Sequence, residues 1–280
     1  MGNTLRRERF KSGTALPIDR HQLIRERLQR DGRVLASELA VEFGLSEDSV
    51  RRDLREMAAA GECQRVYGGA IAMSSNGRPI GERSREHVDR KVRLAQSAVR
   101  LAQSAVRLIQ GGQLVFLDAS TTNLAVAQVL PEDIGLTIAT NSPAIAAALV
   151  GREDLRVILI GGTLDHHVGG TLGTAALLDI QQMRPDICFL GICSIDALAG
   201  VGASQAEDAA FKRQLVAISG AIVAVVTNEK LGTGAPFTIA PLAEITHLVV
   251  EADAEPTHLQ HLAEAGTSLT DAGINILRAD

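Results

Sequence analysis

Between Arg20 and Ala72, apolar residues recur in three successive blocks at the spacing of an amphipathic helix. Asp31-Gly32 ends the first block, Gly44 the second and Gly61 the third, because glycine favours helix ends. Ser46, followed by two acidic residues, is a suitable N-cap for the third helix. The apolar positions are Leu23, Ile24 and Leu28, then Leu35, Leu39, Ala40 and Phe43, then Val50, Leu54 and Met57.

Two short extended segments follow the third helix. Cys63 to Val66 and Ala70 to Met73 flank Gly68-Gly69, which predicts a two-stranded hairpin. Three short helices followed by a hairpin form a winged helix-turn-helix. Residues 1–19 are polar, basic and without periodicity, so we expect a disordered tail.

Beyond Gly111-Gly112, apolar runs typical of buried strands alternate with helical segments. This alternation predicts an α/β domain with a mostly parallel sheet covered on both faces, whose ligands bind beyond the carboxyl ends of the strands. The predicted strands are Leu114–Leu117, Leu136–Thr140, Arg156–Ile160, Ile187–Ile192, Ala221–Val226 and His247–Glu251. The predicted helices are Thr122–Leu130, Pro143–Val150, Thr171–Met183 and Glu207–Ser219.

These patterns divide the 280 residues into two folded parts, which the length also favours. We expect the winged helix-turn-helix at 20–75, a polar linker at 76–90 and an α/β sensor domain at 91–280. Near this junction, Leu94–Arg100 is repeated letter for letter as Leu101–Arg107. Seven residues make about two helical turns, so the duplication lengthens an amphipathic helix by about 10 Å with little rotation of its apolar face.

The composition supports this organisation. Hydrophobic residues make up 46% and aromatic residues 2%, which indicates aliphatic cores. Residues 1–75 hold 13 Lys and Arg against 11 Asp and Glu, and the remainder carries −7, as expected of a DNA-binding part attached to a metabolite sensor. Cys63, Cys188 and Cys193 lack zinc-site spacing, and no signal peptide or membrane-spanning run is present, so we expect a cytoplasmic protein with buried thiols.

The third helix carries the residues that we expect to contact DNA. On a helical wheel its apolar residues face the core, whereas Arg51, Arg52 and Arg55 face outward, where arginine can pair with guanine or phosphate. An arginine-rich helix can also be merely a solvated face, but the helix-turn-helix frame favours DNA contact. Asp53 and Glu56 are expected to form ion pairs within the helix. The predicted DNA-binding residues are Ser37, Ser49, Arg51, Arg52, Arg55 and, in the wing, Arg65.

Candidate anion-binding turns follow the predicted strands of the second part. Asp118 to Thr122 ends a strand and opens a helix, where backbone N–H groups and hydroxyls can bind an anion. Simple N-capping by Ser120 or Thr121 explains the same residues. Asn141 and Gly161-Gly162 lie at two further strand ends, so we expect a pocket along this edge of the sheet.

Several strings occur in a family-specific order: SVRRDL, RVYGGA, FLDASTTNLAVA, ATNSPAIAAAL, VILIGGTL, GGTLG, DICFLGICSID and EDAAFKRQL. Together they resemble the DeoR family of bacterial repressors from Arg20 to about Glu251. The resemblance implies a homo-oligomer that binds double-stranded operator DNA, represses a carbohydrate-catabolic operon and is released by a phosphorylated sugar. It also implies a sensor domain similar in fold to ribose-phosphate isomerases and aminosugar-phosphate deaminases.

The resemblance assigns roles to individual residues of the sensor. Ser120, Thr121 and Thr122 would hold phosphate, Asp118, Asn141 and Asp196 would meet sugar hydroxyls, and Lys212 and Lys230 would supply positive charge, beside the pocket glycines Gly161 and Gly162. The chain departs from the family where GTT is Ser120-Thr121-Thr122, where an acidic-Ser-Ser-Lys stretch is Thr227–Lys230, and where LAQSAVR is doubled. These departures leave the effector undetermined.

The main alternative is a sugar-phosphate isomerase or deaminase with an attached DNA-binding module. Asp118, Glu207 or Asp208 could act as a general base, but no acid–base pair stands out, so we expect a sensor and no enzyme. Gly169–Gly173 lacks the ending of a phosphate-binding P-loop, and His166-His167 lacks metal-ligand spacing. The sequence therefore predicts no metal and no cofactor.

Overall fold

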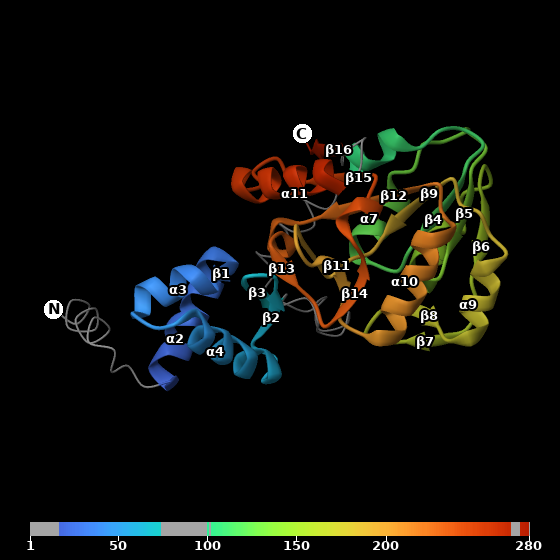
Figure 1. Cartoon of the computed structure of the whole chain (residues 1–280). Coiled ribbons are helices and arrows are strands. Elements are labelled where there is room, and N and C mark those ends of the chain that lie inside the picture. The colour runs from blue at the N-terminus through green and yellow to red at the C-terminus, as the bar shows by residue number, and fades with distance from the viewer. Residues whose placement is uncertain (1–16, 74–99, 101, 270–274, 280) are drawn as a thin grey trace, which may run out of the picture.

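A computed structural model describes residues 17–73, 100, 102–269 and 275–279 (Figure 1). Its first part is the predicted winged helix-turn-helix, called the head below. The head comprises α2 (Pro17–Asp31), β1 (Arg33–Leu35), α3 (Ala36–Phe43), α4 (Glu47–Ala59), β2 (Cys63–Val66) and β3 (Gly69–Met73). Residues 1–16, the linker at 76–90 and most of the first LAQSAVR copy lie outside the described residues.

Two boundaries of the head differ from the sequence prediction. α2 begins at Pro17, inside the range predicted as tail, and proline suits the first turn of a helix, where its missing N–H would have no partner. The second helix, expected to begin near Ser37, begins at Ala36, and Leu35, which was counted among its apolar positions, ends strand β1. Its backbone is extended because Arg33–Leu35 pairs antiparallel with Gly69–Ile71 of the wing.

The predicted packing of α4 is confirmed. The Ser46 hydroxyl accepts a hydrogen bond from the Ser49 N–H at 3.3 Å and so caps the helix. Val50, Leu54 and Met57 are buried in the core of the head, together with residues of α2 and α3. Gly44, with φ of 65°, allows the left-handed turn that separates α3 from α4.

The second part contains the predicted mostly parallel sheet. Seven strands lie in the order β16-β15-β12-β9-β4-β5-β6, and all their pairings are parallel. These strands are β4 (Leu114–Leu117), β5 (Thr137–Thr140), β6 (Arg156–Leu159), β9 (Ile187–Leu190), β12 (Ala221–Val226), β15 (His247–Val250) and β16 (Asn275–Arg278). The helices are α7 (Thr121–Gln128), α8 (Pro143–Leu149), α9 (Thr174–Gln181), α10 (Ala206–Ile218) and α11 (Pro256–Leu269).

Both faces of this sheet are buried, which explains its continuous apolar strands. In β4, Phe116 faces a core shared with α9, α10 and α11, and Val115 and Leu117 face a second core shared with α7 and α8. The Phe116 and Phe211 rings lie 6.2 Å apart between centroids and join the sheet to α10. Residues 102–105 are helical, and Ala102 and Ala105 of the second LAQSAVR copy are fully buried in the second core.

The sequence prediction missed several short elements. The predicted helix Thr171–Met183 is wrong at its start, because β8 (Gly170–Leu172) precedes α9, and Gly173, with φ of 96°, separates the two. The remaining elements are β7 (Thr163–Asp165), β10 (Ser194–Asp196), β11 (Gly200–Ala203), β13 (Thr233–Gly234), β14 (Phe237–Ala240) and the 3-10 helices η2 (Val106–Leu108), η3 (Asn228–Lys230) and η4 (Leu242–Glu244). Among the described residues, no helix is long and apolar enough to cross a lipid bilayer.

Candidate functional site

The outward face of α4 presents three arginines to solvent. Arg51, Arg52 and Arg55 are all exposed. Arg51 forms an ion pair with Glu47 at 2.6 Å, one helical turn earlier, which holds its guanidinium beside the N-terminal end of the helix. The helix therefore offers a cationic face opposite the side that packs in the core.

Asp53 does not form the predicted ion pair within α4. It is buried and accepts two hydrogen bonds from the Arg20 guanidinium of α2, at 2.8 and 3.0 Å. The prediction was wrong because residue 53 lies on the inward side of the helix, close to a cation 33 positions away in sequence. This paired contact fixes α2 against α4 and so orients the arginine face.

The other predicted DNA-binding residues surround this face. Ser37 is exposed in the first turn of α3, and Ser49 lies beside the Ser46 cap, with their hydroxyls 3.0 Å apart. Arg65 is exposed on β2. Tyr67, which was not predicted, is 94% exposed at the tip of the wing, and its place in the RVYGGA turn could have indicated this.

At the carboxyl edge of the sheet, the ends of three adjacent strands are bound together. The Asp118 carboxylate, just after β4, accepts a hydrogen bond from the Gly191 N–H after β9, at 2.8 Å. The Asn141 amide, just after β5, accepts from the Ala119 N–H at 3.0 Å and donates to the Thr171 carbonyl at 3.2 Å. Both polar atoms of Asn141 thus hold neighbouring backbone, which makes it a residue that positions the strand ends.

A buried group of three charged residues lies beside these strand ends. The Lys212 ammonium of α10 is 2.5 Å from the Asp208 carboxylate and 3.6 Å from that of Asp118. All three residues are less than 6% exposed. One oxygen of Asp118 and one of Asp208 have no hydrogen-bond partner among the described residues. The sequence prediction omitted Asp208 from the effector site, although its position four residues before Lys212 on a helix could have indicated the pair.

The surroundings shift the pKa values of two of these groups. Burial raises the pKa of Asp118 to about 7, and the nearby Asp208 adds to this effect while Lys212 opposes it. Burial alone would lower the pKa of Lys212, but the Asp118 and Asp208 carboxylates raise it above its ordinary value. Lys212 is therefore charged at neutral pH, and the net charge of the group changes with the protonation of Asp118.

The predicted phosphate-binding turn opens α7. The Ser120 hydroxyl accepts from the Asn123 N–H at 3.0 Å and caps the helix. Thr121 is exposed and Thr122 is buried, and the first N–H groups of a helix have no intrahelical partners. Gly161 and Gly162 are exposed beyond β6, where a Cβ on Gly162 would lie 2.6 Å from the Leu172 carbonyl oxygen, so close backbone packing requires this glycine.

Asp196 and Lys230 belong to a second group near the head. Both are buried, and their segments are joined because the Gly232 N–H donates to the Ile195 carbonyl at 2.9 Å. One oxygen of Asp196 accepts from the N–H groups of Leu198 and Ala199.

Possible metal ligands cluster at one place in the described part of the chain. His21, Asp53 and Glu56 bring possible ligand atoms within 4.8 Å of one another. Asp53 is already bound by Arg20, so this cluster gives no reason to propose a metal.

Comparisons with known proteins cover both parts. Residues 20–76 match the DeoR-like helix-turn-helix domain, and residues 94–252 match the DeoR C terminal sensor domain. The HTH-type transcriptional regulator GlpR of Haloferax volcanii is 31% identical over 259 residues, which cover 91% of this chain and 98% of that protein. The glycerol-3-phosphate regulon repressor of Escherichia coli is 31% identical over 246 residues, which cover 88% and 95%.

Similarity to solved structures is weaker. Ribose 5-phosphate isomerase A of Methanocaldococcus jannaschii aligns with 46% of this chain and 51% of its own, at 13% identity and a TM-score of 0.34. The winged helix-turn-helix of the head and the parallel sheet of the second part define the fold class.

A capped helix with an exposed arginine face, beside a wing and joined to an α/β domain, defines a DNA-binding transcriptional regulator with a sensor domain. The chain belongs to the DeoR family. As its relatives are named as regulators and repressors, it is a regulator and not an enzyme, which sets the isomerase or deaminase alternative aside.

Proposed function

We propose that this protein represses a carbohydrate-catabolic operon and leaves its operator when a phosphorylated sugar or polyol binds the sensor domain. The buried group of Asp118, Asp208 and Lys212 is the observation that carries the sensing half. Buried carboxylate oxygens are rarely left without partners, because each costs about 1–3 kcal/mol. Hydroxyl groups of a ligand can donate to the two unpartnered oxygens once the strand ends move apart to expose them, which makes a polyhydroxylated ligand a good fit.

For the phosphate, we propose the first turn of α7. Its backbone N–H groups and the hydroxyls of Ser120, Thr121 and Thr122 lie directly after Asp118 in the chain, so one ligand can reach both places. In this proposal Lys212 balances the charge of the buried carboxylates. Lys230 and Asp196 contact the part of the ligand that lies nearest the head. Asn141, Gly161 and Gly162 shape the edge of the site.

For DNA, we propose that α4 enters the major groove. Arg52 and Arg55 contact bases or phosphates, with Arg51, Ser49 and Ser37 beside them. Arg65 in the wing contacts the DNA backbone or minor groove. A homo-oligomer, a dimer or tetramer, would place two heads on a symmetric operator.

Thermal-shift measurements test the sensing half. The compounds are glycerol 3-phosphate, suggested by the Escherichia coli relative, together with ribose 5-phosphate, glucosamine 6-phosphate and inorganic phosphate as control. A ligand at 100 times its Kd stabilises the native state by about 2.7 kcal/mol. We expect one organic phosphate to raise the Tm of the wild type. The same compound should not raise the Tm of Asp208→Asn, a variant that keeps the side-chain size but removes the carboxylate.

Electrophoretic mobility shifts with DNA from upstream of the operon that encodes the protein test the repressing half. The compound that raises Tm should release this DNA. A protein that binds neither the DNA nor any organic phosphate of the panel would contradict the proposed function.

A further inference from the structure

The sensor domain contributes a strand to the sheet of the head. β13 pairs in parallel with the end of β3, so that Thr233 lies opposite Ala72 and Gly234 opposite Met73 (Figure 1). β1 pairs with the preceding residues of β3, Gly69–Ile71, and β13 continues the pairing next to Arg33, the first residue of β1. The wing sheet is therefore completed by a segment more than 150 residues away in sequence.

This contact depends on glycines. A Cβ on Gly234 would lie 2.0 Å from the Gln64 side-chain oxygen and 2.9 Å from the Gln64 Cβ, so the wing can approach only a residue without a side chain. A Cβ on Gly32 would lie 3.3 Å from the Gly232 carbonyl oxygen, and Gly32 itself accepts a hydrogen bond from the Ala72 N–H at 2.7 Å. Head and sensor domain thus meet backbone to backbone.

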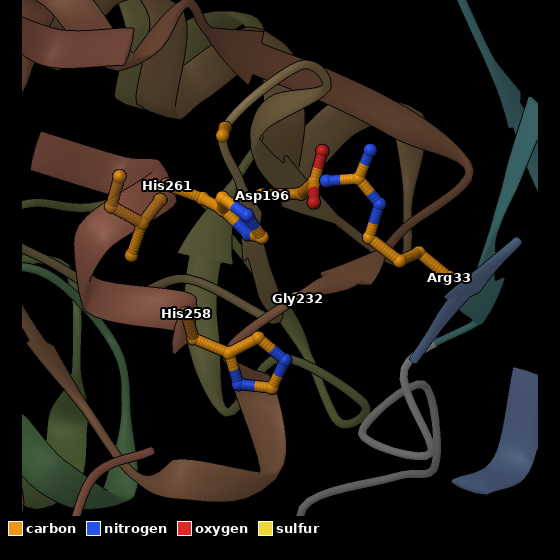
Figure 2. A pocket seen from close by; sticks show the side chains of 7 residues that line it. Arg33, Asp196, Gly232, His258 and His261 are labelled. Carbon is orange, nitrogen blue, oxygen red and sulfur yellow. The ribbon is translucent and has the colours of Figure 1, made fainter. Parts of the chain in front are cut away.

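Charged and polar side chains from both parts close the contact. Arg33 of β1 lines a small cavity with Asp196, His258 and His261 of the sensor domain, and Figure 2 shows the Arg33 and Asp196 side chains extending toward one another. The cavity measures about 10 Å³, which is room for at most one water molecule. It is therefore a closed junction between the two parts and has no space for a metabolite.

The same segment adjoins two proposed effector residues. Leu231 bridges to Ile195, next to Asp196, and the Thr233 hydroxyl donates to the Lys230 carbonyl at 2.8 Å. A displacement of Asp196 is therefore passed to β13 through the backbone contacts of Ile195 with Leu231 and Gly232, and a displacement of Lys230 through the short side chain of Thr233. The Gln64 side-chain oxygen, buried without a partner among the described residues, weakens the docked arrangement and so makes it easier to reverse.

We propose that residues 231–234 couple the sensor to the head, so that effector binding changes the pairing of β13 with β3 and thereby the orientation of α4. This proposal rests on the proposed function, since it concerns how the effector changes operator affinity. A ligand can shift such an equilibrium only through different affinities for the two arrangements, and contacts at Asp196 and Lys230 provide that difference.

The test is Gly234→Ala in the full chain. Operator affinity is measured by fluorescence anisotropy with and without the panel compound that most raises the wild-type Tm, beginning with glycerol 3-phosphate. Coupling in allosteric proteins is typically about 5- to 150-fold, so we expect the wild-type operator Kd to rise within that range. The coupling ratio is the operator Kd with the compound divided by the operator Kd without it. In Gly234→Ala we expect this ratio to fall toward one while the compound still raises Tm.

Two further variants control this test. Gly234→Ala with Gln64→Gly removes the obstructing side chain and should restore the ratio. Gly151→Ala, at a glycine with open space around it, should behave as wild type. Hydrogen exchange of β3 and β13 peptides should be faster in Gly234→Ala than in wild type, which would show that docking is lost.

The outcomes separate the two proposals. A Gly234→Ala protein that keeps the wild-type ratio, or that shows unchanged exchange in β3 and β13, overturns the coupling role. A wild type whose operator affinity responds to none of the compounds overturns the proposed function instead.

Discussion

Replacing Lys212 with methionine tests the buried charged group most directly. The ammonium lies 2.5 Å from Asp208 and 3.6 Å from Asp118, and all three side chains are buried. Methionine keeps most of the volume but removes the positive charge, so the carboxylates lose their counter-ion in a place that water does not reach. Removing one partner of a buried ion pair costs about 3–5 kcal/mol of stability, and we expect the free energy of unfolding to fall by that amount at pH 8.

The loss should depend on pH in a defined direction. Burial raises the pKa of Asp118 to about 7, so this carboxyl stabilises the fold below its ordinary pKa and loses that contribution as the pH rises through 7. Lys212 opposes the rise, so its removal raises the pKa of Asp118 further. Each added pKa unit corresponds to about 1.4 kcal/mol of extra destabilisation at pH values above it. The difference in free energy of unfolding between Lys212→Met and wild type should therefore be smaller at pH 5.5 than at pH 8.

Urea unfolding at the two pH values measures this difference. Arg184→Met removes an exposed cation from the same domain and should change stability by less than about 0.5 kcal/mol at either pH. A pH-independent loss in Lys212→Met would refute the reasoning, because it would show that packing of the side chain, and not its charge, stabilises the site.

Three other predictions concern the head and its control. Arg52→Ala should weaken operator binding by about 1–3 kcal/mol in anisotropy titrations, whereas Glu56→Ala on the same helix should not weaken it; equal effects would remove Arg52 from the interface. The chain has one tyrosine and no tryptophan, so its intrinsic fluorescence reports on Tyr67 at the wing tip, and saturating operator should change the emission. An unchanged spectrum would place the wing away from DNA. Lys230→Ala should bind operator as wild type does but need more effector for release, and normal release would argue against its role.

Much of the head could be predicted because its structure is governed by local contacts. The Ser46 cap, the glycine after α3 and the buried stripe of α4 each depend on residues within a few positions. The Arg20–Asp53 pair could not be predicted in this way, because the two residues meet only after α2 and α4 have packed. Asp53 was expected to pair within its own helix, because a helical wheel describes one helix and does not show that Arg20 of α2 faces it.

The site in the sensor domain was predictable in part. The structure brings Asp118, Ser120 and Asn141 to one edge of the sheet, as expected because strand ends in a parallel sheet meet there. Lys212 was assigned only by family resemblance, and its partner Asp208 was omitted, because the sequence does not show which side of α10 is buried against β4 and β9. Asp196 and Lys230 were assigned to the same pocket by family resemblance, and only the structure shows that their segments also adjoin the strand that meets the head.

The sequence by itself determined the two folded parts, the parallel order of apolar strands and helices, and the cationic face of α4, because each follows from a repeating local pattern. Tertiary structure decided the junction between the parts. Thr233–Gly234 is too short for any periodicity, and it becomes a strand only because β3 offers unpaired backbone groups beside it. The sequence indicates that Gly32 ends a helix, but it does not indicate that Gly32 and Gly234 also need their small size where two distant segments come into contact.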